Sequence, residues 1–283
     1  FTDAANGILK VSNTQGQSEL SEKLGLWEDA LNQYITESNG GSINPGSKIN
    51  FSSACSKMDM KSILGVMNCL SHLSRFSELI NIANSVLSNP SCTPEMKLSS
   101  LRYAASASWH LFDYGNFAKF ADQFIIESNK GIKKSNEESE NSDEISENDY
   151  IIIMANILKK NFKAARSVIE QIRLNSCNKL FPLIGQNYEL VYEDSSIISS
   201  LSEAEEVIEF LEQDQIAKSP EKSVREEAYN SMRRIKKLWK IRFSSLKPIS
   251  SVLHHHLCIR SIVLPISEQS EGFLSLIGSS IEQ

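Results

Sequence analysis

The sequence contains few of the residues that interrupt helices: 12 glycines and 7 prolines in 283 residues. Glycine and proline end helices and shape the turns of β-rich folds, so their scarcity favours an all-helical chain. The hydrophobic share of 41% and the charged share of 23% are ordinary for a globular protein. A chain of this length could form two compact domains or one extended array, and length alone does not decide between them.

Cysteine and long apolar runs are also scarce. The five cysteines are widely spaced and form no C-x-x-C pair, which argues against a disulfide framework and a structural zinc site. We expect reduced, mostly buried thiols in a cytosolic protein. The most apolar window, 'SSVLHHHLCIRSIVLPIS', is interrupted by three histidines and an arginine, so no membrane span is predicted. The start at Phe1 shows no signal-peptide pattern. The pattern of the rest of the sequence is already under way at the first residue and continues to the last, which predicts a segment of a longer protein.

Catalytic motifs are missing from the sequence. It contains no G-x-G-x-x-G, G-x-x-x-x-G-K-[ST], H-R-D, D-F-G, G-x-S-x-G or H-E-x-x-H pattern. The run His254, His255 and His256 makes a poor metal site, because adjacent side chains of a helix point in different directions. We therefore assign no catalytic, cofactor-binding or metal-binding residue, and expect this segment not to be an enzyme.

The sequence does contain a repeat. In 'SEKLGLWEDALNQYITES' the turn residue Gly25 is followed by an aromatic residue at +2, a small residue at +5 and an aromatic residue at +9. Similar offsets recur around Ser74, Gly115 and Lys160, with a weaker match at Ser202. The other repeat positions are Trp27, Ala30, Tyr34, Phe76, Leu79, Phe117, Phe162 and Ala165.

The +2 positions are 41 to 49 residues apart. A period of this size, with helical patterns on both sides of each turn, is typical of α-solenoids. Offsets of three, four and seven fall on one helix face, and a hairpin can bury that face only by stacking on its neighbours. We therefore predict an all-α fold, an α-solenoid of about five to six tetratricopeptide-like helical hairpins.

Two polar stretches interrupt this pattern. Residues 38–57 are rich in Ser, Asn and Gly, and residues 128–149 are acidic, so both are predicted to be disordered loop insertions. Most of the net charge of −6 lies in and beside the second stretch. This insertion is either a solvated loop or a phosphorylation or docking segment. Since no basic surface dominates the chain, no nucleic-acid partner is expected.

Other helices are visible between the turns. Thr93 is a candidate N-cap, with Pro94 at the first helical position. The stretch 'SVREEAYNSMRRIKKLWKIRFSSLKP' predicts one long helix whose apolar stripe is Val224, Ala228, Met232, Ile235 and Trp239. The basic residues at positions 233–240 fall mainly on the opposite faces. They form either a solvated face or a site for a polyphosphate or an acidic partner.

Five collinear blocks carry a family resemblance: 'EKLGLWEDALNQY', 'GVMNCLSHLSRFSEL', 'AASASWHLFDYGNF', 'LSEAEEVIEF' and 'RRIKKLWKIRF…LCIRSIVLPISE'. In order and spacing, the chain from residue 20 onward resembles the FAT domain of target of rapamycin (TOR) kinases, which are phosphatidylinositol-3-kinase-related Ser/Thr protein kinases. The block 'VLHHHL' departs from that pattern, which has a Trp and charged residues there.

The resemblance implies a non-catalytic scaffold, with residues 1–283 forming part of one FAT solenoid that clamps a kinase domain further along the parent chain. Its partners would be that kinase domain and TOR complex subunits, in the cytoplasm or at endomembrane surfaces, with dimerisation left to other regions. ATP and Mg²⁺ would bind only to the parent's kinase domain. The resemblance also implies contacts to an inositol polyphosphate, for which Arg260 is the candidate; Arg260 could equally pair with a neighbouring hairpin.

Two other classes of function are weighed against this one. A free-standing repeat adaptor that binds peptides would need convergent polar residues on its first helices. The stripe from Ile63 to Leu73 is flanked by Ser, Asn and Lys without a basic clamp, which counts against the adaptor. An enzyme would need a convergent set of acid, base or nucleophile, and the sequence offers none.

Overall fold

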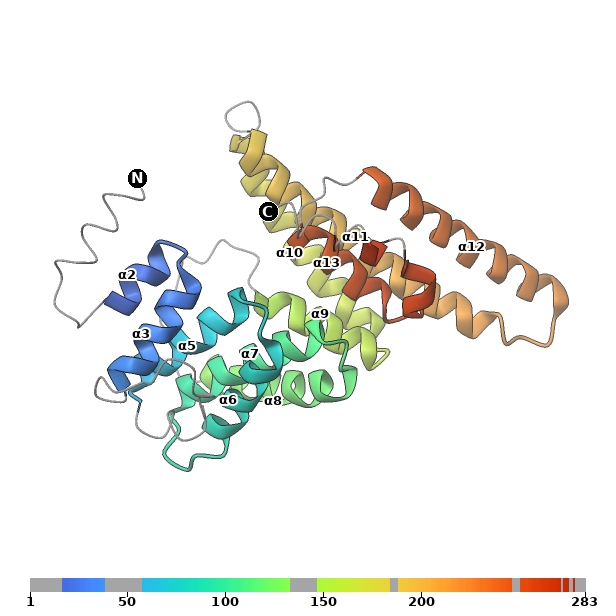
Figure 1. Cartoon of the computed structure of the whole chain (residues 1–283). Helices are drawn as coiled ribbons and strands as arrows, with labels where there is room; N and C mark the ends of the chain where they lie inside the picture. Colours follow the sequence, from blue (N-terminus) through green and yellow to red (C-terminus); the bar gives the residue numbers. More distant parts are fainter. Residues whose placement is uncertain are drawn as a thin grey trace. The chain divides into compact units, whose positions relative to one another are not determined.

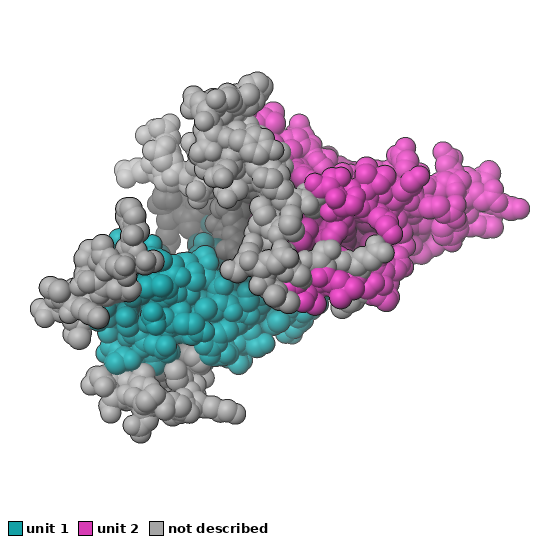
Figure 2. Space-filling view, turned by 45° about the horizontal axis from the view of Figure 1, so that its top comes forward, with its two compact units in different colours: residues 1–138 teal, residues 139–283 magenta. Residues whose placement is uncertain are grey.

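Figure 1 traces the chain in a computed structural model, which describes residues 17–38, 58–132, 147–183, 188–245, 250–270, 272–274 and 277. Every regular element in this part of the chain is a helix, so the predicted all-α class is confirmed. The chain divides into two compact units, Phe1–Glu138 and Ser139–Gln283, coloured separately in Figure 2.

Unit 1 is a stack of helical hairpins. Each helix packs against its neighbour in sequence, and α5 also packs against α2 and α7, as expected when consecutive hairpins stack side by side. Its helices are α2 (Gln17–Lys23), α3 (Trp27–Ser38), α5 (Met60–His72), α6 (Phe76–Leu87), α7 (Pro94–His110) and α8 (Tyr114–Ile132).

Unit 2 is built around one long helix, α11, which packs against α10, α12 and α13. The helix α9 pairs with α10 to form a hairpin. The elements, shown from yellow-green to red in Figure 1, are α9 (Glu147–Leu158), α10 (Phe162–Leu183), α11 (Tyr188–Ile216), α12 (Lys222–Ser245), α13 (Ser250–Arg260) and the 3₁₀ helix η1 (Ile266–Gln269).

Three of the predicted turn residues have left-handed backbone: Gly25 (φ 73°), Ser74 (φ 55°) and Lys160 (φ 59°). In each hairpin the second helix begins two residues later. The amide after each turn residue bonds back across the last turn of the first helix, for example Leu26 N to Ser21 O at 2.9 Å. This is the pattern of a Schellman C-cap, which explains why the chain reverses at these positions.

The turn of the third hairpin is at Phe112 (φ 57°), not at Gly115 as the spacing predicted. Asp113 N donates to Ser108 O at 2.9 Å, which completes the same C-cap. Gly115 lies inside α8, so Phe117 is at +5 of the repeat rather than +2. The prediction was wrong because glycine was taken as the sign of a left-handed residue, whereas the cap holds a phenylalanine there.

The weak fifth match at Ser202 was also wrong. Ser202 lies in the middle of α11, where the helix continues without a turn. The apolar residues that suggested a repeat, Ala204 and Val207, are buried. Their spacing of three is that of any continuous buried helix face, so it carries no information about a turn.

In the corrected register, the +5 and +9 positions form the buried face of each second helix. Those at +5 are Ala30, Leu79, Phe117 and Ala165, and those at +9 are Tyr34, Ala83, Ala121 and Ile169, all of them buried. The +2 residues of the first two hairpins are only partly buried and stack on a histidine of the following hairpin. Trp27 lies on His72 (ring centroids 3.8 Å apart, planes at 7°) and Phe76 lies on His110 (4.6 Å, 12°).

The long predicted helix and the predicted N-cap are both confirmed. Thr93 Oγ1 accepts a hydrogen bond from Met96 N at 3.3 Å, and α7 begins at Pro94. The stripe of α12 is buried at Ala228, Met232, Ile235 and Trp239.

Most of the two polar stretches lies outside the described residues, namely 39–57 and 133–146. Their edges, however, are helical: residue 38 ends α3, residues 128–132 continue α8, and residues 147–149 begin α9. The predicted bounds of the two insertions were therefore too wide at these edges.

Two helical glycines of unit 1 provide a test of the packing. A Cβ atom on Gly65 would overlap the ring of Tyr34, whereas one on Gly115 would meet only Asp113 Oδ1, at 3.6 Å. We predict that Gly65→Ala lowers the free energy of unfolding by about 1–3 kcal/mol through overpacking. In the matched control Gly115→Ala, the free energy of unfolding should stay unchanged or rise by up to about 1 kcal/mol. Urea unfolding of both variants measures these changes. Equal changes in the free energy of unfolding would contradict the register in which the hairpins of unit 1 pack.

Candidate functional site

In unit 1, a polar network joins the first two of the blocks that carry the family resemblance. Glu22 on α2 accepts hydrogen bonds from Tyr34 Oη on α3 (2.6 Å) and Asn68 Nδ2 on α5 (2.6 Å). Tyr103 Oη on α7 then donates to Asn68 Oδ1 at 3.4 Å. Burial and the bond to Glu22 raise the pKa of Tyr34, so its hydroxyl stays protonated and donates. Four helices are thus linked through one carboxylate and one amide.

In unit 2 a carboxylate also lies where several helices meet, and here it is fully buried. Glu203 on α11 is 0% exposed. Arg260 on α13 donates to both of its oxygens, Nε to Oε2 at 3.0 Å and Nη2 to Oε1 at 2.5 Å. His256 Nδ1, one turn earlier on α13, lies 2.9 Å from Oε2. Arg242 on α12 adds a bond from Nη1 to Oε1 at 3.2 Å.

Glu206, one turn after Glu203, extends this network toward α12. It accepts two hydrogen bonds from Arg242, both 2.7 Å long, and one from Trp239 Nε1 at 2.7 Å. The bidentate geometry is the strongest form of an arginine–carboxylate pair. We call Glu203, Glu206, Arg242, His256 and Arg260 the Glu203 network; it ties α12 and α13 to α11.

In the Glu203 network two carboxylates face two guanidinium groups. The Arg260 guanidinium also lies 5.3 Å from the Phe243 ring centroid and 5.9 Å from that of Trp239. Burial by itself would raise the pKa of Glu203, but His256 and Arg260 together lower this pKa to about 2. Glu203 is therefore ionised at neutral pH, and the network is a structural ion cluster.

For Arg260 the sequence left two roles open, a polyphosphate contact and a pairing with a neighbouring hairpin. The side chain is buried, at 5% exposed, and its guanidinium is held by Glu203. The structure thus shows the pairing, while the polyphosphate contact stays a prediction.

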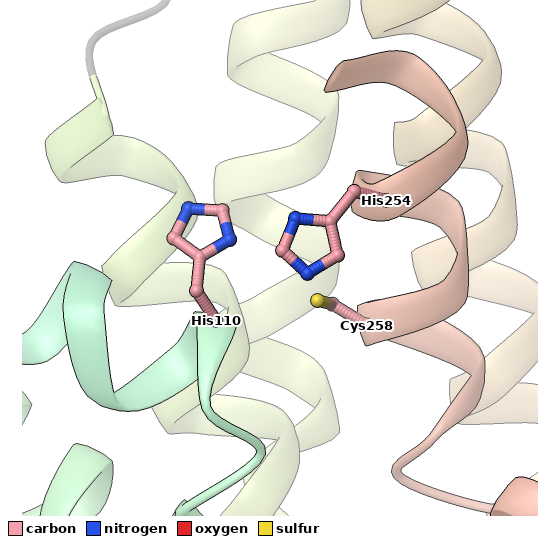
Figure 3. A group of neighbouring side chains, drawn as sticks. All are labelled: His110, His254 and Cys258. Atoms are coloured by element: carbon pink, nitrogen blue, oxygen red, sulfur yellow. The ribbon is translucent and has the colours of Figure 1, made fainter. Parts of the chain in front are cut away.

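The three consecutive histidines point to different neighbours. His256 faces Glu203, and the His255 ring stands edge-on to Tyr150, with centroids 4.1 Å apart. Figure 3 shows His254 and Cys258 one turn apart on α13, with their side chains on the same side of the helix. Burial lowers the pKa of His254. These two side chains supply two donor atoms, fewer than the three or four protein ligands of a zinc site.

The third side chain labelled in Figure 3 is His110, which belongs to unit 1. It is the last residue of α7, and its ring stacks on Phe76 at the start of α6. The structure therefore gives His110 a packing role within the hairpin stack.

The basic face of α12 is partly neutralised. Lys236 Nζ lies 2.6 Å from Glu268 Oε2, and Arg234 lies 3.9 Å from Glu209. The exposed apolar residues Leu238 and Ile241 share the helix. A groove of about 850 Å³ borders α12; among its lining residues are Lys236, Lys237, Lys240, Phe243, Leu257 and Arg260.

Sequence reasoning missed the carboxylates at the centre of both networks. A signal for Glu203 was present: it precedes Ala204 and stands four residues before Val207, within the apolar stripe of α11. A glutamate in such a stripe must find a cationic partner to be buried. The sequence did not show which arginine would supply it, because Arg242 and Arg260 lie 39 and 57 residues away.

We predict that Glu203→Gln lowers the free energy of unfolding by about 3–5 kcal/mol at pH 7, because it leaves the buried guanidinium group of Arg260 without its carboxylate. The folded-state pKa of Glu203, about 2, lies below the unfolded value. Its contribution is therefore complete above the unfolded pKa of about 4.3 and is lost as the pH falls toward the folded value. Urea unfolding between pH 7 and pH 3 should show the difference from wild type shrinking.

The matched control is Glu212→Gln on the same helix. Glu212 accepts a bidentate pair of hydrogen bonds from Arg166 at the surface, Nη1 to Oε1 at 2.9 Å and Nη2 to Oε2 at 2.7 Å. Exposed pairs contribute about 0–1 kcal/mol, so this variant should lose at most about 1 kcal/mol of the free energy of unfolding at pH 7. Similar losses in the two variants, or a Glu203→Gln difference that does not change with pH, would contradict the assignment.

The chain is similar to known proteins along nearly its whole length. Two curated relatives, the proteins named "Serine/threonine-protein kinase TOR" from Oryza sativa subsp. japonica and Arabidopsis thaliana, are each 25% identical over 276 residues. These alignments cover 96% of this chain but 10% of each relative, so the chain spans about a tenth of their length. None of the helices in the described ranges is long and apolar enough to cross a bilayer.

A family model described as "FAT domain" matches residues 101–280. This range includes α11, α12 and α13 with the whole Glu203 network. Because the model matches more than half of the chain, the protein belongs to the FAT domain family.

Proposed function

We propose that this chain is a non-catalytic scaffold segment in the FAT domain of a TOR-type Ser/Thr protein kinase. The observation that carries the proposal is the similarity to two TOR kinases along 96% of the chain. The structure supports it, because two of the resembling blocks, 'LSEAEEVIEF' and 'CIRSIVLP', meet in the core at Glu203 and Arg260. Blocks that are far apart in sequence are thus parts of one packed unit.

The proposed mechanism is mechanical. Stacked hairpins and buried ion pairs give stiff helical units, and a stiff unit can hold a kinase domain in position and offer surface to TOR complex subunits. ATP and Mg²⁺ would bind to the kinase domain of the parent chain, since this segment carries no phosphoryl-transfer motif. The parent would act in the cytoplasm or at endomembrane surfaces.

Inositol polyphosphate binding is part of this proposal. The groove beside α12 is lined by Lys236, Lys237 and Lys240, three cations that suit a polyanion. Arg260 also lines it, but Glu203 holds that guanidinium. Lys236 is also paired, with Glu268, but that pair is exposed and therefore weak, whereas the pair of Arg260 with Glu203 is buried. Lysines of α12 rather than Arg260 would therefore make the main contacts.

The proposal predicts that the parent transcript continues past Gln283 into a kinase lobe, with a catalytic loop of H-R-D type or its family variant and a D-F-G motif. Sequencing that transcript measures this directly. A chain that stops after a few more hairpins would contradict the proposal and leave a free-standing peptide-binding adaptor as the better account.

A second prediction concerns the parent kinase. Glu203→Gln should lower the substrate phosphorylation of the purified parent several-fold, because loosening α12 and α13 from α11 weakens the scaffold. Glu212→Gln should leave it unchanged. The activity is measured below the thermal transition of both variants, and equal activities would show that the Glu203 network does not support the kinase.

A further inference from the structure

The turn between α11 and α12 carries the tetrapeptide Ser219-Pro220-Glu221-Lys222. A serine followed by proline at +1 is the pattern that proline-directed Ser/Thr kinases select, and a basic residue at +3 is the further preference of the cyclin-dependent kinases among them. The sequence contains one other Ser/Thr-Pro pair, Thr93-Pro94, which has Met96 at +3. Ser219 is thus the one position of the chain that matches the full pattern.

The turn presents this tetrapeptide to solvent. Helix α11 ends at Ile216 and α12 begins at Lys222, so Ser219 lies between two helix ends. Ser219 is partly exposed, Pro220 and Glu221 are exposed, and the Lys222 side chain is 82% exposed. A kinase binds its substrate as an extended segment, and helix ends open at low cost. The position is therefore accessible in the folded chain.

The Ser219 hydroxyl is only weakly engaged. Its oxygen accepts a hydrogen bond from Glu221 N at 3.3 Å, near the limit for such a bond. Thr93 is different, because its Oγ1 caps α7 by accepting from Met96 N and lies 3.7 Å from Met60 Sδ. Modifying Thr93 would break a helix cap, whereas modifying Ser219 would not.

Cations surround the turn and could receive a phosphate. Arg225 Nη1 donates to the carbonyl oxygens of Ser219 (3.1 Å) and Pro220 (3.0 Å). Lys218 and Lys222 flank the serine and make surface pairs with Asp214 and Glu226. Such exposed pairs are weak, so a dianionic phosphate can replace the carboxylates as the partner of these cations. A negative charge before the first turn of α12 also interacts favourably with the helix dipole.

We propose that Ser219 is a phosphorylation site for a proline-directed Ser/Thr kinase, and that the phosphate fixes the α11–α12 turn by binding Arg225. In the transfer, Ser219 Oγ attacks the γ-phosphorus of Mg-ATP. The bond from that phosphorus to the β–γ bridging oxygen breaks, and ADP leaves. The hydroxyl proton passes to the kinase's catalytic aspartate and then to solvent.

The first test treats the folded chain with a purified cyclin-dependent kinase and its cyclin, with Mg-ATP, and locates the phosphate by mass spectrometry. We expect close to one phosphate per chain at Ser219. Incorporation should be lost in Ser219→Ala, fall several-fold in Lys222→Ala, which removes the +3 cation, and stay unchanged in the control Thr93→Ala. No phosphate at Ser219, or phosphate there only after heat denaturation, would overturn the site.

The second test measures amide hydrogen exchange in the first turn of α12, residues 222–226, with and without the phosphate. We expect exchange to slow by roughly two- to fivefold on phosphorylation, in line with a charge placed at a helix N-terminus. Most of this slowing should disappear in Arg225→Gln. Unchanged exchange in the phosphorylated chain, or full slowing in Arg225→Gln, would overturn the role given to Arg225.

Discussion

The packing of unit 2 depends on the carboxylate of Glu203. This group is fully buried, and removing a charge from water costs several kcal/mol unless good partners replace the solvent. Arg260 and His256 from α13 and Arg242 from α12 supply those partners. Because the partners come from two helices, α12 and α13 must both be in place before the charge is satisfied. One buried charge therefore makes the packing of three helices cooperative.

In unit 1 the central carboxylate is bound by neutral hydrogen-bond donors instead of cations. Glu22 is partly buried and accepts from a phenol and an amide, Tyr34 and Asn68, rather than from guanidinium groups. Neutral donors stabilise less than charged ones, but they cost less to bury. Packing supplies the rest, as where Tyr34 lies against the bare backbone of Gly65. The two units thus share the arrangement of one carboxylate among several helices and differ in the charge of its partners.

Much of the fold could be predicted from the sequence, because local rules govern hairpins. The buried Ala30 and Ala165 follow from helical periodicity, and the cap at Thr93 from the preference for a hydroxyl before proline. The turn at Phe112 could not be found by a rule that looks for glycine, since hydrogen bonds of the C-cap hold it. Nor could the pairing of Glu203 with Arg260 be predicted, because 57 residues separate the partners and periodicity carries no information on tertiary contacts.

The most direct test of this account is a double-mutant cycle between Glu203 and Arg260, with the free energy of unfolding measured for wild type, Glu203→Gln, Arg260→Gln and the double variant. If the buried pair is what couples α13 to α11, the double variant should lose much less free energy of unfolding than the sum of the losses in the two single variants. The coupling energy should then be about 2–3 kcal/mol, at the upper end for residues in contact. Additive losses, within about 0.5 kcal/mol, would contradict the account and leave α13 held by apolar packing alone.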